Sequence, residues 1–427
     1  MSPEPPETPS GGKWHKRIAC LVDFFSGSPA HLALGSIVPG SGIGGGISAV
    51  QDLSGNSKYR ALSGNVLYTS SGFWSANGQF LFQPFAYKLK HNGHECLGPF
   101  CAKDHFNIAI FAMHRELRSI DFFGLGPTSN GSSKFNFGER DTVAGVTASL
   151  PLTNWMRVVS TLENHSPDIA RSGDPVSVRQ NFTEATLPGL ATQPLFMRYD
   201  NLVELHNLPE PPYSALLRAG YDIYQSIDQS RFSFGQFHAA GYVSKKIEHD
   251  IKDSPGTIGS HFCPKTGKKA WTCDYGEITF SARTALSHTD AGDVVPFYYQ
   301  PTLGGQDIDG NETLRGYPNY RFRGPHSLLM QVEYSHDLVI HIERRQKQKK
   351  DGSTTTEHVD WSTFAGYLFY DAGAVGLKVS DLALDRMRQD AGIGLKVKLA
   401  GTVGVRTYIA MGASGGLRWG WNLGKVF

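Results

Sequence analysis

Apolar and polar residues alternate with a period of two along most of this chain, in segments separated by clusters of Gly, Asn, Asp, Ser and Pro. This alternation predicts β-strands with one apolar and one polar face, because successive side chains of a strand point to opposite sides. We expect strands over residues 42–51, 58–70, 73–87, 105–118, 133–151, 154–164, 194–206, 213–226, 230–247, 275–289, 327–338, 361–372, 388–399, 402–411 and 415–427. Since single-chain membrane barrels usually have an even number of strands, we expect about sixteen in all, with one more in the first half of the chain.

The last third of the chain shows the alternation most clearly. In its final segment, one face carries Leu417, Trp419, Trp421, Leu423 and Phe427. A soluble β-sandwich alternates in the same way, and a soluble propeller would repeat about every 40–50 residues. No such repeat is present. Many strands with aromatic residues near their ends, joined by short turns and long loops, favour a transmembrane antiparallel β-barrel, an all-β fold.

Composition favours a β-barrel over a helical membrane protein. Hydrophobic residues make up 40% and charged residues 19% of the 427 residues, and the mean hydropathy is −0.29. No run approaches the ~18 apolar residues of a membrane helix, whereas a barrel averages to a polar hydropathy. The net charge of +2 gives no reason to expect a nucleic-acid partner. We expect an irregular N-terminal segment over 1–41 and a barrel over 42–427.

Four of the five Cys residues fall into two close pairs in polar stretches that contain Gly and Pro: Cys96 with Cys101, and Cys263 with Cys273. Loop disulfides in an oxidising compartment are the simplest interpretation. His91, His94 and His105 flank the first pair, and these ligand types could bind Zn²⁺. Their spacing fits no standard zinc motif, so we expect no metal and no cofactor.

The connection between about 290 and 326 is longer than two adjacent strands need, and loops of this length usually have a function. It carries the run Leu314-Arg315-Gly316-Tyr317. The glycine allows a tight turn, and the planar guanidinium of Arg315 can engage two carboxylates. Candidate partners lie at inward-facing positions of the strands that follow: Glu333, and Asp371 within Phe369-Tyr370-Asp371-Ala372-Gly373. An ordinary solvated loop arginine is the alternative, but the two motifs together favour a buried charged clasp.

These motifs resemble those of the bacterial surface-antigen family, the BamA/TamA-type outer membrane assembly barrels. Leu314-Arg315-Gly316-Tyr317 matches the family's (Val/Ile/Leu)-Arg-Gly-(Phe/Tyr) signature, and the run from Phe369 to Gly373 matches its Phe-x-Asp-x-Gly motif. The resemblance implies that the signature lies at the tip of the sixth extracellular loop, folded into the barrel lumen, with Arg315 paired to Asp371 and Glu333. It also implies a C-terminal signal, read by the assembly machinery, made of Trp419, Trp421, Leu423 and Phe427.

The resemblance implies a bacterial outer-membrane protein that acts in protein insertion or translocation without covalent chemistry. Its partners would be outer-membrane lipids, lipopolysaccharide and client proteins. The family's best-known members carry periplasmic POTRA domains before the barrel, and the residues before 42 are too few for one. We therefore expect either a minimal barrel-only protein or a chain from which such domains have been removed.

In such a protein the first and last strands pair weakly and form a lateral gate where a client strand can add to an exposed edge. Gly44, Gly45 and Gly46 would weaken the first strand, although a bend at the barrel rim explains them equally well. The alternative function is a structural or channel-forming barrel that handles no clients. No nucleophile motif accompanies any histidine, so we expect no enzyme.

Overall fold

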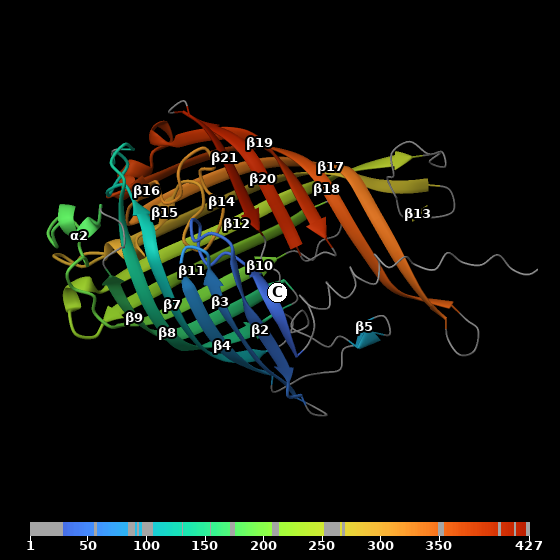
Figure 1. The fold of residues 1–427 in the computed structure, drawn as a ribbon, viewed down its shortest axis with the longest axis horizontal. Coiled ribbons are helices and arrows are strands. Elements are labelled where there is room, and N and C mark those ends of the chain that lie inside the picture. Colours follow the sequence, from blue (N-terminus) through green and yellow to red (C-terminus); the bar gives the residue numbers. More distant parts are fainter. Residues whose placement is uncertain are drawn as a thin grey trace, which may run out of the picture.

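The computed structural model of this chain describes residues 29–54, 58–83, 90–91, 94–95, 106–129, 131–153, 155–170, 176–206, 213–251, 265–266, 270–348, 354–399, 403–413 and 416–423. Long tilted strands dominate the fold, and Figure 1 shows them arranged as one strongly curved sheet with loops at its ends. Within these ranges, no helix has the length and apolar character needed to cross a membrane.

Each main strand pairs antiparallel with the next one along the chain. These strands are β1 (Ala30–Gly35), β2 (Gly44–Asp52), β3 (Tyr59–Thr69), β4 (Trp74–Gln83), β7 (Asn107–Phe122), β8 (Phe135–Pro151), β9 (Met156–Ala170), β10 (Phe196–His206), β11 (Tyr213–Ser226), β12 (Phe234–Ile251), β14 (Ala270–His288), β17 (His326–Gln348), β18 (Thr354–Gly376), β19 (Arg388–Leu399), β20 (Val403–Gly412) and β21 (Leu417–Leu423). The sheet counts 17 strands in the described ranges, and one of them, β13 (Lys265–Thr266), is a two-residue piece beside β14, which leaves 17 − 1 = 16. The expected all-β fold with sixteen antiparallel strands is confirmed.

The strand that the sequence did not reveal is β1, which lies inside the segment that we expected to be irregular. Its six residues are too few for a clear alternation, and a turn rich in Gly, Ser and Pro follows it. The sheet therefore begins before residue 42, which corrects the expected boundary. Gly44, Gly45 and Gly46 consequently lie in the second strand, where a Cβ on Gly46 would come 1.9 Å from the Val66 carbonyl oxygen of β3. Gly44 and Gly46 therefore permit a close approach to the backbone of β3, whereas a Cβ on Gly45 would meet nothing closer than a Leu34 methyl at 3.9 Å.

The two faces of the sheet have opposite chemistry. Along β18, Leu368 and Tyr370 are 55% and 44% exposed, whereas Phe369 and Asp371 on the other face are 5% and 0% exposed. The other strands likewise carry exposed apolar side chains on their outer face: Ile47, Val66, Ile110, Val146, Leu162, Leu217, Ile278, Ile393, Ile409 and Trp419. A soluble protein places its apolar face inward. Here the outer face is apolar, and the inner face buries charged groups such as Asp371 beside aromatic ones such as Phe369.

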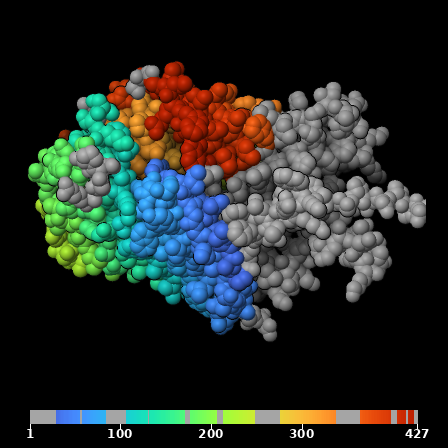
Figure 2. Space-filling view, in the orientation of Figure 1, coloured from blue at the N-terminus to red at the C-terminus, as the bar shows by residue number. Residues whose placement is uncertain are grey.

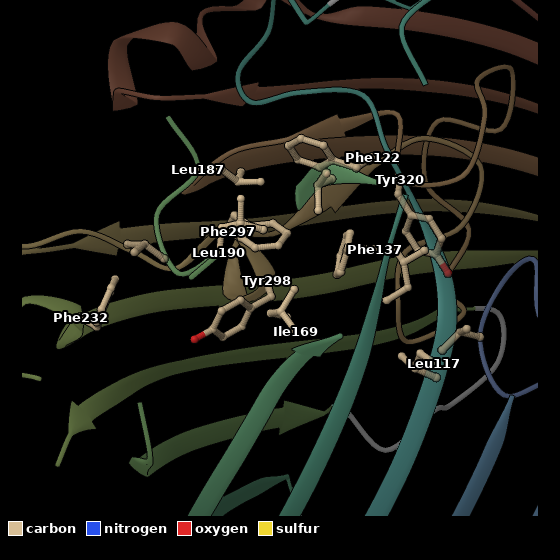
Figure 3. Packing of buried hydrophobic residues seen from close by; sticks show 14 of the residues in the cluster. Leu117, Phe122, Phe137, Ile169, Leu187, Leu190, Phe232, Phe297, Tyr298 and Tyr320 are labelled. Carbon is tan, nitrogen blue, oxygen red and sulfur yellow. The ribbon is translucent and has the colours of Figure 1, made fainter. Parts of the chain in front are cut away.

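A cluster of buried apolar side chains, mostly aromatic, packs at one end of the inner face (Figure 3). Phe122 of β7 and Phe137 of β8 meet Phe297 of the 3-10 turn η3 (Phe297–Tyr299) edge to face, with ring centroids 5.8 and 4.9 Å apart. Phe196 of β10 and Phe232 of η2 (Ser230–Phe232) belong to the same cluster. The cluster therefore joins several strands to the chain that follows β14.

That chain, residues 289–325, is here called the central segment. It is organised around a short ladder of β15 (Thr302–Leu303) with β16 (Phe322–Arg323). The Tyr320 hydroxyl donates to the Pro39 carbonyl oxygen in the β1–β2 turn at 2.9 Å, and the Asn422 side chain of β21 donates to the Gly310 carbonyl oxygen at 3.5 Å. The central segment thus contacts both the first hairpin and the last strand.

The described residues include no ladder between β1 and β21. Figure 2 shows the first strands, in blue, and the last strands, in red, on the same face of the molecule.

Candidate functional site

The local backbone of the central segment presents Arg315 at a tight turn. The Tyr317 amide donates to the Leu314 carbonyl oxygen at 3.0 Å, which closes the turn around Arg315. Gly305 holds the turn from the other side, because its amide donates to Leu314 O at 2.8 Å and its carbonyl accepts from the Thr313 amide at 2.9 Å. Gly305 has φ +54°, a left-handed conformation that favours glycine.

Gly316 allows this turn to lie directly on the sheet. A Cβ at this position would be 2.6 Å from the Asp390 Cβ of β19 and 2.8 Å from the Gly412 amide nitrogen of β20. Leu314 and Tyr317 are 0% and 5% exposed. They belong to one apolar cluster, whose other members are Leu303, Phe322, Leu329 and Val375. All four residues of the Leu-Arg-Gly-Tyr run are therefore held against strands.

Arg315 makes a bidentate ion pair with Asp371 of β18. Its Nε and Nη2 donate to the two carboxylate oxygens at 2.8 and 2.7 Å, and its backbone amide donates to Oδ2 at 3.2 Å. Its Nη1 donates to Glu333 of β17 at 2.9 Å. The guanidinium carbon lies 3.5 Å from the ring centroid of Phe369, a cation–π contact. Gly373 leaves room nearby, since a Cβ there would be 3.0 Å from a methyl of Leu303.

Arg315 and Asp371 are both buried, so each charge needs the other as a partner in place of water. Arg315 is 2% exposed and Asp371 0% exposed. Burial lowers the pKa of Arg315, but the hydrogen bonds to Asp371 and the surrounding carboxylates outweigh it, so the net pKa is raised above that of a free arginine. Removing one partner of a buried pair typically costs about 3–5 kcal/mol, because the other charge is left without compensation.

The charged network extends beyond the three residues that the sequence suggested. Arg406 of β20 contacts Glu333 at 2.6 Å and Glu312 of the central segment at 3.3 Å, and Lys396 of β19 also pairs with Glu333. With Arg315 and Asp371, the network holds three cations and three carboxylates, so its charges balance. Lys396 and Arg406 face each other directly in the β19–β20 register. Two like charges opposite each other repel, and Glu333, which pairs with both, compensates this repulsion. We call this set of six charged residues the clasp.

Other expected site residues lie elsewhere. Trp419 and Trp421 are on the outer face, 66% and 38% exposed, away from the clasp. Leu423 ends β21, and Phe427 lies outside the described residues. The structure describes no side chain of the four paired cysteines or of the three flanking histidines. It gives the backbone alone for Cys273 in β14, for His91 in β5 (Lys90–His91) and for His94 in β6 (His94–Glu95). The two expected disulfides therefore stay predictions.

The fold matches that of a solved BamA structure. A crystal structure of BamA from Haemophilus ducreyi lacking POTRA domains 1–3 superposes with a TM-score of 0.54 over 92% of this chain and 70% of that chain, at 12% sequence identity. The chain has a BamA-like fold. The siderophore receptor PirA from Pseudomonas aeruginosa matches over 93% of this chain and 74% of that chain, at 9% identity, but its TM-score of 0.24 supports no inference. No family model and no curated protein matches the sequence.

The BamA-like fold confirms the family resemblance at the level of architecture. Within this fold the clasp joins the central segment to β17, β18, β19 and β20 through ion pairs between side chains, with one backbone hydrogen bond from Arg315 to Asp371. The Arg-Gly pair and the two acidic partners were identifiable from motifs. Glu312 and Arg406 were not, although Glu312 lies three positions before Arg315 and Arg406 has the inward parity of its strand.

Proposed function

We propose that this chain is a bacterial outer-membrane β-barrel that inserts or translocates client proteins without covalent chemistry, with outer-membrane lipids and lipopolysaccharide around it. The observation that carries the proposal is the buried Arg315–Asp371 pair inside a BamA-like fold. A buried ion pair is seldom the most stabilising choice for a site and is better suited to fixing one arrangement. We infer that the clasp holds the central segment inside the lumen.

The outer face supports a membrane setting. Its exposed side chains are aliphatic or aromatic on strand after strand, as Val66, Leu217 and Ile393 illustrate. A contiguous apolar surface of this extent is unfavourable in water, whereas lipid-facing positions of a barrel require it. The buried charged groups on the other face then line a polar interior.

In this proposal the sheet closes into a barrel between β1 and β21, and that seam is the gate. β1 has only six residues and β21 seven, so a β1–β21 ladder would have few hydrogen bonds. Short terminal strands expose backbone donors and acceptors to which a client strand can add. The Tyr320–Pro39 and Asn422–Gly310 contacts support this placement, because they tie both ends of the sheet to one segment.

The test is client folding in vesicles. The purified chain is reconstituted in liposomes, an unfolded eight-stranded barrel is added, and its folding is followed by the shift between folded and unfolded bands on unheated gels. We expect faster client folding than in liposomes that contain an unrelated barrel of similar size. A disulfide between cysteines introduced into β1 and β21 is expected to abolish the acceleration, and reduction is expected to restore it.

A structural or channel-forming barrel is the competing function, and the same preparation distinguishes it. Unchanged client folding together with steady ion conductance across a planar bilayer would refute the insertion proposal and establish the channel. The buried aromatic cluster at one end of the inner face argues against a wide open pore, since it fills the space between the strands and the central segment.

A further inference from the structure

Three potential metal ligands converge on the inner face of β10, β11 and β12, away from the clasp. Asp200 of β10 and Asp222 of β11 are directly opposite each other in the antiparallel register, and His238 of β12 lies opposite Gly220 of β11. One ligand atom from each of Asp200, Asp222 and His238 can be chosen so that all three lie within 4.8 Å of one another. Two carboxylates opposite each other repel, so this arrangement requires a positive charge.

Gly220 is the feature that brings the histidine to this place. A Cβ on Gly220 would lie 2.5 Å from the His238 Nε2 atom and 2.8 Å from Cε1, so the imidazole lies across the backbone of β11 where any other residue would block it. Its Nδ1 is 3.0 Å from Asp222 Oδ2, and its Nε2 is 3.9 Å from Asp200 Oδ1. The ring therefore reaches from β12 over β11 toward β10.

Arg198 contacts one oxygen of each carboxylate. Its guanidinium contacts Asp222 Oδ1 at 2.7 Å and Asp200 Oδ2 at 3.6 Å. The other oxygen of each carboxylate faces His238. Asp200 Oδ1 is buried and has no hydrogen-bond partner among the residues that the structure describes. Arg198 also pairs with Glu163, so its single charge is shared among three carboxylates.

We propose that Asp200, Asp222 and His238 form a binding site for a divalent first-row transition metal ion such as Zn²⁺. Imidazole nitrogen and carboxylate oxygen are ligands that Zn²⁺ accepts at about 2.0–2.2 Å, and tetrahedral coordination places ligand atoms roughly 3.3 Å apart. His238 offers one ring nitrogen to the ion, and the three ligand atoms lie within 4.8 Å of one another, so small side-chain rotations bring them to this spacing. Mg²⁺, which prefers oxygen ligands and keeps its waters, fits a site with an imidazole less well.

The site is accessible to an ion from the interior. Asp222 and His238 line a cavity of about 460 Å³ between the strands and the central segment. A bound ion would cross-link three adjacent strands and satisfy the free oxygen of Asp200. The competing source of positive charge is a protonated His238, which would pair with both carboxylates and leave no ligand nitrogen. This inference does not depend on the proposed insertion activity.

The experiment measures Co²⁺ and Zn²⁺ binding by the folded chain in detergent, after treatment with a chelator, at about pH 7.5, since a metal ion binds only the neutral imidazole and displaces its proton. We expect one equivalent of Co²⁺ with visible absorption bands of nitrogen and oxygen coordination, displaced by Zn²⁺ and not by Mg²⁺. His238→Ala and the isosteric Asp200→Asn are expected to weaken binding at least about tenfold, the range found for losses around metal sites. Gly220→Ala is expected to weaken it as well, by displacing the ring while keeping every ligand.

His114→Ala is the matched control. His114 lies on β7, bonds to Thr142 and packs on Trp74, and it has no part in the site. Its loss is expected to leave binding unchanged. Folding of each variant is checked by its gel shift. No Co²⁺ binding by the wild-type chain would overturn the proposal. So would equal binding by wild type, His238→Ala and Asp200→Asn, which would show an adventitious ion only, and a sulfur charge-transfer band would place that ion on cysteines.

Discussion

Replacing Arg315 by alanine tests the clasp directly. The substitution leaves Asp371, which is 0% exposed, and Glu333 without their shared guanidinium. An uncompensated buried charge costs about 3–5 kcal/mol, and the lost cation–π contact with Phe369, at 3.5 Å, adds roughly 0.5–2 kcal/mol. Lys396 and Arg406 still neutralise Glu333 in part, so we expect a total loss of about 3–5 kcal/mol.

The measurement is urea unfolding in detergent micelles, read from folded and unfolded bands on unheated gels. Arg386→Ala is the matched control, because Arg386 also pairs with an aspartate, Asp381 at 3.1 Å, but is 57% exposed. An exposed pair is worth at most about 1 kcal/mol. Arg315→Lys keeps the charge and loses the bidentate geometry, so it should fall between wild type and Arg315→Ala.

A second substitution separates lost pairing from general damage. In the Arg315→Ala background, Asp371→Asn removes the uncompensated charge and should recover part of the lost stability, giving a coupling energy above about 1 kcal/mol in a double-mutant cycle. If Arg315→Ala unfolds at the same urea concentration as Arg386→Ala, the buried pair contributes no more to stability than the exposed pair, and the reasoning is refuted.

Three further substitutions probe other parts of the molecule. Gly316→Ala should cost about 1–3 kcal/mol by overpacking against Asp390, 2.6 Å away, and should make the central segment sensitive to protease; unchanged resistance would contradict this. Tyr320→Phe removes the hydrogen bond to Pro39, worth about 0.5–1.5 kcal/mol, and should speed amide exchange in the β1–β2 turn while leaving β8 unchanged; equal exchange would show that the bond does not hold the turn. Trp419→Arg on the outer face should reduce folding into lipid vesicles, by up to about 2–4 kcal/mol at the bilayer midplane; folding as complete as that of wild type would argue against a lipid-facing position.

The strands could be predicted because the alternation repeats locally, without knowledge of neighbours. β1 was not predicted because its six residues give only three positions per face, too few to show an alternation. β17 and β18 are 23 residues each, longer than expected, since both continue past the apolar alternation into polar sequence. In that extension the two strands pair with each other after the ladder of β17 with β14 and the ladder of β18 with β19 have ended. Pairing of this kind depends on backbone hydrogen bonds and leaves no hydrophobic signature.

The clasp was only partly predictable for a related reason. Arg315 and Asp371 stand in recognisable motifs, so their pairing could be inferred although 56 positions separate them. Arg406 has no motif, and its role depends on the register that sets it opposite Lys396 and on the sheet curvature that turns both toward Glu333. His238 is similar, because its reach across β11 depends on a glycine in a neighbouring strand.

The hydrogen bond from Tyr320 to Pro39 has a consequence for the order of assembly. It joins residues 281 positions apart, whereas every ladder in the sheet joins strands that are consecutive along the meander. Closing so long a loop early would cost chain entropy with no nearby contacts to offset it. Hairpins can therefore form first, and docking of the first turn onto the central segment comes late. Slow amide exchange around Tyr320 would then indicate that the first turn has docked onto the central segment. Fast exchange there would indicate that the hairpins have formed but docking has not occurred.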